Sequence, residues 1–225
     1  MRHSKLAFGT QSRKTLPFTL AGLVFFTRPL TVDEDLSLSD VGDRYDLETL
    51  EPQETVAFLD EQLVIVADLL QSRVQGEPQP LVTAGWAGMN LGASNLAKVL
   101  HFLRTGQRPE GPFELGAWEE ETFTVQDREF RPLRPSFAEQ REAAMIGAAK
   151  STREAIEGGL AFLALLLTNR AVDEQPVEVA WLRANLGTPD VTALTSYLQN
   201  GPQQEAAPNA PAEAASADGS SASAA

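Results

Sequence analysis

Apolar residues recur at helical spacing in the segment that begins at Pro52. They occupy i, i+3, i+4 and i+7 positions, while Asp60 and Asp68 lie off this stripe. Such a pattern predicts an amphipathic helix with one buried face. Pro52 suits the first helical position, because the N–H that proline lacks has no intrahelical partner there. The members of the stripe are Val56, Leu59, Leu63, Val66, Ala67, Leu70 and Val74.

Two shorter segments combine apolar alternation with β-branched and aromatic residues. Residues 18–30 read FTLAGLVFFTRPL, with a turn expected at 21–22, and residues 123–133 read FTVQDREFRPL, with a turn expected at 126–127. Strand-forming residues on both sides of a short turn favour a β-hairpin in each segment.

Three segments carry the S/T-x-x-E pattern of a helix capping box. In such a box the hydroxyl and the carboxylate satisfy backbone amides that have no partner at a helix start. The boxes are Thr31/Glu34, Ser136/Glu139 and Ser151/Glu154. In the second half of the chain they predict one helix over residues 137–150 and another that starts at 151 and ends near 169.

The two halves of the chain resemble each other. Residues 82–106 read VTAGWAGMNLGASNLAKVLHFLRTG and residues 177–201 read VEVAWLRANLGTPDVTALTSYLQNG, a fixed offset of 95. Seven positions are identical, which is more than chance would give, and both segments contain W-x-x-x-N-L-G. The identical pairs are Val82/Val177, Trp86/Trp181, Asn90/Asn185, Leu91/Leu186, Gly92/Gly187, Leu103/Leu198 and Gly106/Gly201.

The match continues upstream at larger offsets. Thr31 pairs with Ser136 at an offset of 105, and Arg73 pairs with Arg170 at an offset of 97. The decreasing offset indicates extra residues in the first half, most of them in the acidic stretch 33–51, which we interpret as a solvated loop. The predicted domains are a basic arm (1–14), repeat domain 1 (15–107), a Gly/Pro-containing linker (108–119), repeat domain 2 (120–201) and an Ala/Pro/Ser-rich tail (202–225).

Each repeat is expected to close with two more helices. Trp and Asn four residues apart fit one helical turn, which Gly92 or Gly187 ends. A final helix follows, capped by Ser94 in the first repeat and by Thr188 with Pro189 in the second. The predicted fold is α+β and helix-dominated: two tandem copies of a β-hairpin followed by three or so helices.

The composition of the last 25 residues differs from that of the rest. They contain no Leu, Ile, Val or aromatic residue. A segment of this kind buries too little apolar surface to offset the loss of chain entropy, so we predict a disordered tail.

The charge of the chain bears on its partners. It has 18 Lys and Arg against 31 Asp and Glu, a formal net charge of −13. Residues 1–31 carry five basic residues and no acid, whereas residues 32–80 carry 13 acids and two basic residues. Contacts with phosphates and anionic lipids need Lys and Arg, so we expect neither nucleic acid nor membrane as a partner. The longest apolar run, residues 160–167, is too short to span a bilayer, and no signal-peptide cleavage pattern is present, so we expect a soluble protein.

Little in the sequence points to catalysis. The chain has no Cys, its only histidines are His3 and His101, and no phosphate loop, zinc motif or calcium loop occurs. We expect no catalytic, cofactor-binding or metal-binding residues and no cofactor. The acidic stretch fits capping and solvation better than cation binding. His101, on a helix with Lys98 and Arg104, is interpreted as a surface residue.

Trp86 and Trp181 are the residues most informative about function. One interpretation is that each Trp anchors the core of its repeat. The other is that it forms an exposed anchor for a partner, because Trp is enriched at binding hot spots. The candidate partner-binding residues are Trp86, Asn90, Leu91, Trp181, Asn185 and Leu186.

Taken together, the basic arm, the FTLAGLVFFTRPLTVDE segment and the W-x-x-x-N-L-G turn leading to HFLRTG resemble the tail assembly chaperones of long-tailed (siphovirus-like) bacteriophages, here apparently as a tandem duplication. The resemblance covers mainly residues 5–107. It implies a non-enzymatic protein of the bacterial host cytoplasm that binds the tape-measure protein and helps recruit tail-tube subunits. Two alternatives remain open: a structural subunit of a phage tail or connector that is retained in the particle, and an enzyme based on carboxylates.

Overall fold

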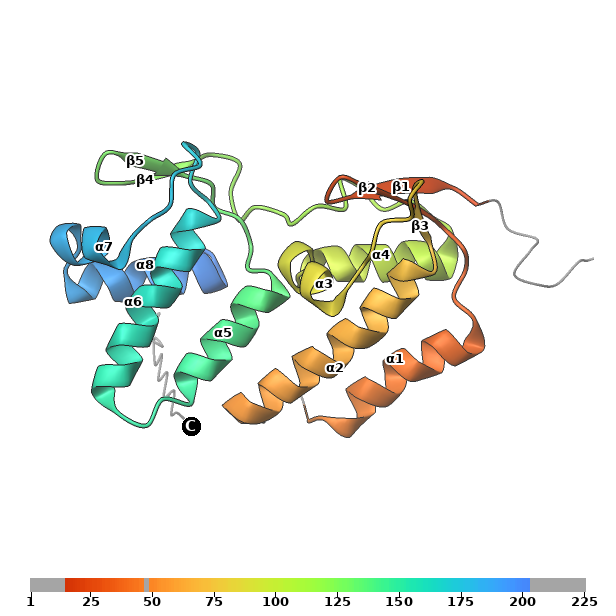
Figure 1. Ribbon diagram of the computed structural model, residues 1–225, viewed down its shortest axis with the longest axis horizontal. Helices are drawn as coiled ribbons and strands as arrows, with labels where there is room; N and C mark the ends of the chain where they lie inside the picture. Colours follow the sequence, from red (N-terminus) through yellow and green to blue (C-terminus); the bar gives the residue numbers. More distant parts are fainter. Residues whose placement is uncertain (1–14, 47–48, 203–225) are drawn as a thin grey trace, which may run out of the picture.

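The computed structural model describes residues 15–46 and 49–202. In this part of the chain helices dominate and the strands form small antiparallel sheets (Figure 1), which confirms the predicted α+β class. The basic arm at 1–14 and residues 203–225 of the predicted disordered tail lie outside the described residues.

Both halves of the chain have two strands followed by four helices, and the first half has one more short strand between its second and third helices. In the first half the elements are β1 (Pro17–Leu20), β2 (Leu23–Phe26), α1 (Val32–Arg44), α2 (Pro52–Gln71), β3 (Val74–Gln75), α3 (Ala84–Asn90) and α4 (Ala93–Thr105). In the second half they are β4 (Phe123–Val125), β5 (Arg128–Phe130), α5 (Phe137–Gly147), α6 (Thr152–Thr168), α7 (Val179–Asn185) and α8 (Thr188–Asn200). Both predicted hairpins and the predicted start of α2 at Pro52 are confirmed.

Strand pairing also corresponds between the halves. The predicted hairpins pair Phe18 with Phe25 and Phe123 with Phe130. In the first half β2 continues the sheet to β3. In the second half this pairing is reduced to one bridge, between Phe130 and Ala171.

Each half has its own hydrophobic core. In the first, the rings of Phe18, Phe102 and Phe113 meet with centroid distances of 4.9 to 5.8 Å, between the sheet and α4. In the second, Phe130 packs with the apolar residues of α6, and with Leu182 and Leu198 from the last two helices. The stripe predicted for α2 lies in the first core, except Val56 near its start, but Val74 does so from strand β3, because the helix ends at Gln71 and the chain then pairs with β2.

All three predicted capping residues start helices, but only two of the three capping boxes are complete. Thr31 and Ser136 each accept from the amide of the Glu three residues on, whose carboxylate accepts from the amide of the capping residue. Ser151 accepts from the Glu154 amide, but the carboxylate of Glu154 accepts from Lys150, one residue earlier.

The solvated loop predicted at 33–51 is wrong over most of its length, because residues up to Arg44 belong to α1. Acidic residues in the first turn favour the helix N-terminus, and the helix buries Val41 and packs Leu38 against the first core. The extra residues of the first half are distributed over two helices as well as the segment between them. The helix α1 has 13 residues, against 11 in its counterpart α5, and α2 has 20, against 17 in its counterpart α6.

The predicted caps at Ser94 and Thr188 are also wrong, since α4 and α8 begin one residue after Gly92 and Gly187. The amide of each glycine donates to the side chain three residues on, Asn95 at 2.7 Å and Asp190 at 2.9 Å. Those side chains satisfy the amide of the glycine before the helix, and no side chain of the described residues caps the first turn in the way expected of the Ser and Thr hydroxyls.

The two halves pack against each other through α5. This helix contacts α6 of its own half and also α2 and α3 of the first, so α1, α2, α5 and α6 lie side by side (Figure 1). Phe137, its first residue, joins the first core, and its amide donates to the Leu91 carbonyl at 2.7 Å.

The segment predicted as a linker is also packed. Phe113 is buried in the first core, and its carbonyl accepts from the side chain of Asn95. Trp118 contacts the second half: its amide donates to Pro132, its indole N–H donates to Leu198, and the guanidinium of Arg134 lies 4.3 Å from its ring. The chain between the two cores is therefore fixed at both ends.

Candidate functional site

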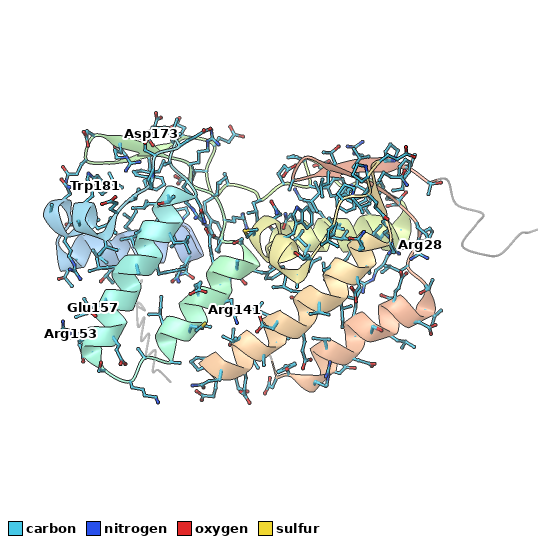
Figure 2. The ribbon with its side chains drawn as sticks, in the orientation of Figure 1. Arg28, Arg141, Arg153, Glu157, Asp173 and Trp181 are labelled. Carbon is cyan, nitrogen blue, oxygen red and sulfur yellow. The ribbon has the colours of Figure 1, made fainter. Side chains whose placement is uncertain are left out.

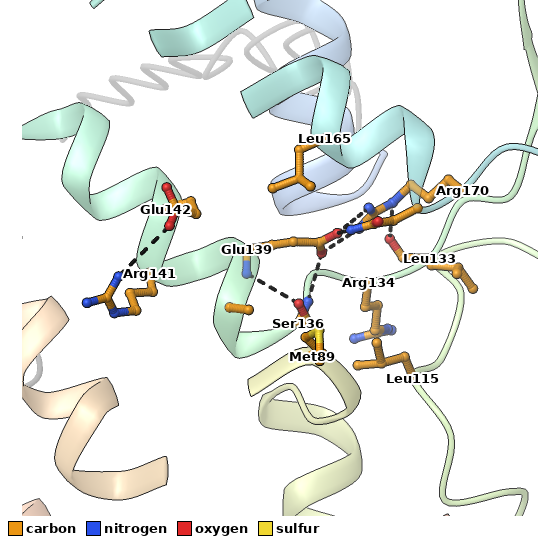
Figure 3. A pocket seen from close by; sticks show the side chains of 12 residues that line it. Met89, Leu115, Leu133, Arg134, Ser136, Glu139, Arg141, Glu142, Leu165 and Arg170 are labelled. Atoms are coloured by element: carbon orange, nitrogen blue, oxygen red, sulfur yellow. Dashed lines mark hydrogen bonds and ion pairs between the residues drawn. The ribbon is translucent and has the colours of Figure 1, made fainter. Parts of the chain in front are cut away.

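A pocket of about 620 Å³ opens where the two halves meet (Figure 3). Its wall comes from α3, the residues before α5, the start of α5 and the end of α6. The apolar residues in the wall are Met89, Leu115, Leu133, Ala138 and Leu165, and the polar ones are Arg134, Ser136, Glu139, Arg141, Glu142, Asn169 and Arg170.

Two exposed apolar side chains flank the pocket. Met89 on α3 is 64% exposed and Leu165 on α6 is 41% exposed. Figure 3 shows them on opposite sides of the Glu139 carboxylate. Leu165 is left outside because the apolar run of α6 is too continuous for every member to face the core. Apolar surface of this kind, held next to a hollow, is typical of a site that receives another molecule.

The buried carboxylate in the wall is fully paired. One oxygen of Glu139 accepts from Asn169 and Arg170, and the other accepts from the Ser136 amide and Arg170, all at 2.7 to 3.0 Å. Burial by itself raises the pKa of Glu139, but the hydrogen bonds and charge of Arg170, with the Asn169 and Ser136 donors, hold that pKa below its ordinary value. Glu139 is thus an ionised structural group.

The charged side chains nearer the mouth have partners too. Arg141 donates to Asp60 at 2.7 Å and lies 3.9 Å from Glu142. Arg134 stacks on Trp118 and donates to the Ala117 carbonyl. Because these groups are engaged within the chain, the pocket offers shape and apolar surface rather than an unpaired acid or base.

The structure places the two predicted Trp residues half-buried at the edges of the two cores. The Trp86 ring lies 5.9 Å from that of Phe25, and the Trp181 ring lies 5.6 Å from the guanidinium of Arg128. Each Trp therefore packs on its core while part of it reaches the surface. Neither lines the pocket described above.

The other candidate residues have local structural contacts. Asn90 and Asn185 donate to the carbonyls of the Trp residues four positions earlier, at 2.9 and 2.8 Å. Leu91 is fully buried and so cannot touch a partner in this fold, whereas Leu186 is partly exposed.

The acidic stretch and His101 show no site. His101 is exposed on α4. Asp35 of the acidic stretch forms an ion pair with Arg104 at 2.8 Å. Over residues 15–46 and 49–202, no group of three or more His, Asp or Glu residues is placed to hold a metal ion. In the same residues, no helix is long and apolar enough to cross a bilayer.

Sequence reasoning missed the residues that define the pocket. Met89 lies inside the W-x-x-x-N-L-G segment, directly before Asn90, and its helical position relative to Trp86 gave no sign that it points outward. The signal for Leu165 was available, since eight apolar residues in a row on a helix must place some on the outer face. Comparison with protein-family models, with curated proteins and with solved structures finds no match for this chain.

Proposed function

We propose that this chain is a non-enzymatic chaperone for bacteriophage tail assembly that binds the tape-measure protein and helps recruit tail-tube subunits in the host cytoplasm. The observation that carries the binding role is the pocket between the halves, where Met89 and Leu165 stand exposed beside an apolar hollow. The phage setting rests on the sequence resemblance.

The chemistry of the pocket suits an amphipathic helix as the bound segment. A hollow of this size takes one or two large apolar side chains, and the flexible, polarizable side chain of Met89 adapts to different shapes. Arg141 and Glu142 beside it offer polar contacts to the flanks of such a helix. The net charge of −13 helps to keep a complex with an apolar partner dispersed.

The paired state of the polar groups supports binding over catalysis. General acid–base chemistry needs a group that can exchange a proton with a substrate, and Glu139 is committed to Arg170.

The test is co-expression with the tape-measure protein encoded by the same phage, a very long helical protein whose gene is expected downstream. We expect the tape-measure protein to become soluble and to co-purify with the chain. The double variant Met89→Glu/Leu165→Glu should lose this effect, whereas Val64→Glu, also at an exposed apolar residue but on α2 and outside the pocket, should keep it.

Two results would contradict the proposal. One is a tape-measure protein that stays insoluble with the wild-type chain present. The other is recovery of the chain in mature particles, which would favour a structural subunit instead.

A further inference from the structure

The second core is less covered than the first. Leu59 on α2 is 3% exposed, while Ile156, at the equivalent position of α6, is 58% exposed. The same holds at three more pairs, in which the first residue is buried and the second is partly exposed: Leu63/Leu160, Leu91/Leu186 and Leu96/Val191.

The cover of the first half is α5. It lies on α2 and α3, with Arg141 on Asp60 and Ala138 against Gly88. Within the described part of the chain, the equivalent place on α6 and α7 has no such cover, and it adjoins a groove of about 650 Å³ between α6, α7 and α8, lined by Ile156, Leu160, Leu186 and Val191 among others. Figure 2 shows Arg141 on the side of α5 toward α2, and Arg153 and Glu157 on the side of α6 away from α5.

Substitutions between the halves deepen this groove. Phe58, Gln62 and Leu100 of the first half correspond to Ala155, Gly159 and Thr195, which line the groove in the second. The smaller side chains leave the volume open.

In the first half the helix equivalent to α5 is α1. The face of α1 that corresponds to the covering face of α5 is exposed. Both helices use one face inside their own half: Glu34, Leu38 and Val41 on α1 correspond to Glu139, Ala143 and Ile146 on α5. The opposite face of α5 covers the first half. On α1 that face is exposed, with Val32 at 75% and Leu36 at 54%.

We propose that α1 of a second molecule of this chain docks on the open face of α6 and α7, along the edge of this groove, as α5 docks on α2 and α3 within the molecule. The contact joins unlike surfaces, so the molecules add head to tail.

Charge complementarity supports this occupant. Within the molecule, Ala138 of α5 lies against Gly88 of α3. In the proposed contact, Asp33 takes the position of Ala138 and Arg183 takes that of Gly88. Within the molecule, Met145 of α5 and Val56 of α2 line a small hollow together. In the proposed contact, Asp40 takes the position of Met145 and Arg153 takes that of Val56. The contact thus brings two Asp residues of α1 opposite Arg183, which lines the groove, and Arg153, which lies on α6 beside it. Among the described residues Arg153 pairs with the exposed Glu157 of the same helix, and an exposed pair of this kind can be replaced by another at little cost.

The glycine at position 187 also supports the docking of a second molecule. A Cβ on Gly92 would lie 2.5 Å from the carbonyl oxygen of Pro135, so the approach of the segment before α5 requires glycine there. Gly187 holds the same position in the second half, with an ordinary negative φ, and within residues 15–46 and 49–202 no backbone atom of another segment lies within 4 Å of its Cβ position. A docked second molecule would bring a backbone carbonyl to this place.

The test is sedimentation velocity of the full chain over a range of concentrations, with two charge-reversal variants. We expect the wild-type mass to rise above that of a monomer with concentration. Asp33→Arg/Asp40→Arg and Arg153→Asp/Arg183→Asp should each weaken association by at least about tenfold, because like charges then face each other. A mixture of the two variants restores opposite charges at every contact and should associate like the wild type.

Two further variants sharpen the result. Gly187→Ala should weaken association while the monomer keeps its melting temperature. Glu77→Arg/Glu110→Arg, in loops outside both faces, should leave association unchanged. A wild-type chain that stays monomeric up to about millimolar concentration, or reversed variants whose mixture fails to regain association, would overturn the proposal. The Met89→Glu/Leu165→Glu variant lies outside both faces and should still self-associate, so loss of partner binding and loss of self-association are separable.

Discussion

The guanidinium of Arg170 bonds both carboxylate oxygens of Glu139, at 2.7 and 3.0 Å. Arg73 bonds Glu34 in the same way, at 3.0 and 2.9 Å. Each Arg also donates to the carbonyl four residues before it, Leu69 or Leu166. In each half this pair ties the helix that follows the hairpin to the end of the next helix.

Removal of Arg170 should be strongly destabilising. Arg170→Ala leaves the buried Glu139 carboxylate without its cation, and we expect a loss of about 3 to 5 kcal/mol in the free energy of unfolding. Urea denaturation followed by circular dichroism measures it. Glu139→Gln/Arg170→Met, which removes both charges, should recover much of the loss, and Arg153→Ala, at an exposed pair, should change little. An Arg170→Ala protein as stable as Arg153→Ala would contradict a structural role for the pair.

Stability should fall in acid. The pKa of Glu139 is lower in the folded chain than its ordinary value of 4.5, which stands for the unfolded chain. The ionised form therefore stabilises the fold fully above about pH 4.5, and this contribution is lost as the pH falls through the lower, folded-state pKa. The pKa of Glu34 is shifted in the same direction: burial raises it, but the hydrogen bond from Arg73 and the other donors and charges outweigh burial.

The measurement is the urea midpoint at pH 7, 5, 4 and 3. Glu139→Gln should be less stable than the wild type at pH 7 and should show a flatter decline below pH 5. An unchanged slope in that variant would show that Glu139 does not contribute to the acid sensitivity.

Glycine should be required at position 92 but not at 187 in the single molecule. A Cβ at Gly92 would lie 2.5 Å from the Pro135 carbonyl oxygen, so Gly92→Ala must shift α5 away from the first half, and we expect a loss of about 1 to 3 kcal/mol. Gly187→Ala meets only the side chains of Asp190 and Pro189, at 3.3 Å or more, and should be nearly neutral. Thermal melting at low protein concentration compares the two. Equal losses would contradict the close approach seen only in the first half.

A second pair of glycines tests the packing of Trp118. Gly106 and Gly201 both have positive φ at helix C-termini, at 71° and 81°. Ala at Gly106, where ψ is 6° and the backbone is left-handed helical, carries strain of about 1 kcal/mol, whereas Gly201 has a ψ of −176°, in a region essentially restricted to glycine, so Ala is more strained there. A Cβ at Gly201 would also lie 2.7 Å from the Trp118 ring, whereas one at Gly106 meets nothing within 4 Å. Gly201→Ala should therefore lower the melting temperature more than Gly106→Ala. In a Trp118→Ala background that difference should become smaller, leaving the part due to the backbone at Gly201, and an unchanged difference would show that the Trp118 ring does not contribute.

The sequence by itself determined the local elements. Both hairpins, the three capping-box helix starts and the long amphipathic helix depend on residues a few positions apart, whose hydrogen bonds and buried faces follow directly from spacing. The alignment of the halves also placed Arg73 with Arg170, and Glu34 with Glu139, at matching positions. The acidic stretch was misread because its charge was weighed over the apolar spacing of Leu38 and Val41.

Only the tertiary structure decided how the halves meet. No local pattern shows that Phe137 belongs to the first core, that Phe113 and Trp118 fix the connecting segment, or that Met89 and Leu165 flank one pocket. Most of these contacts join residues far apart in the sequence, such as Trp118 and Leu198, which are 80 positions apart. They depend on the orientation of α5, because one face of this helix packs against its own half and the opposite face packs against the first half. That choice is made by the shape of the surface left open on the first half, and this surface exists only once the first half has folded.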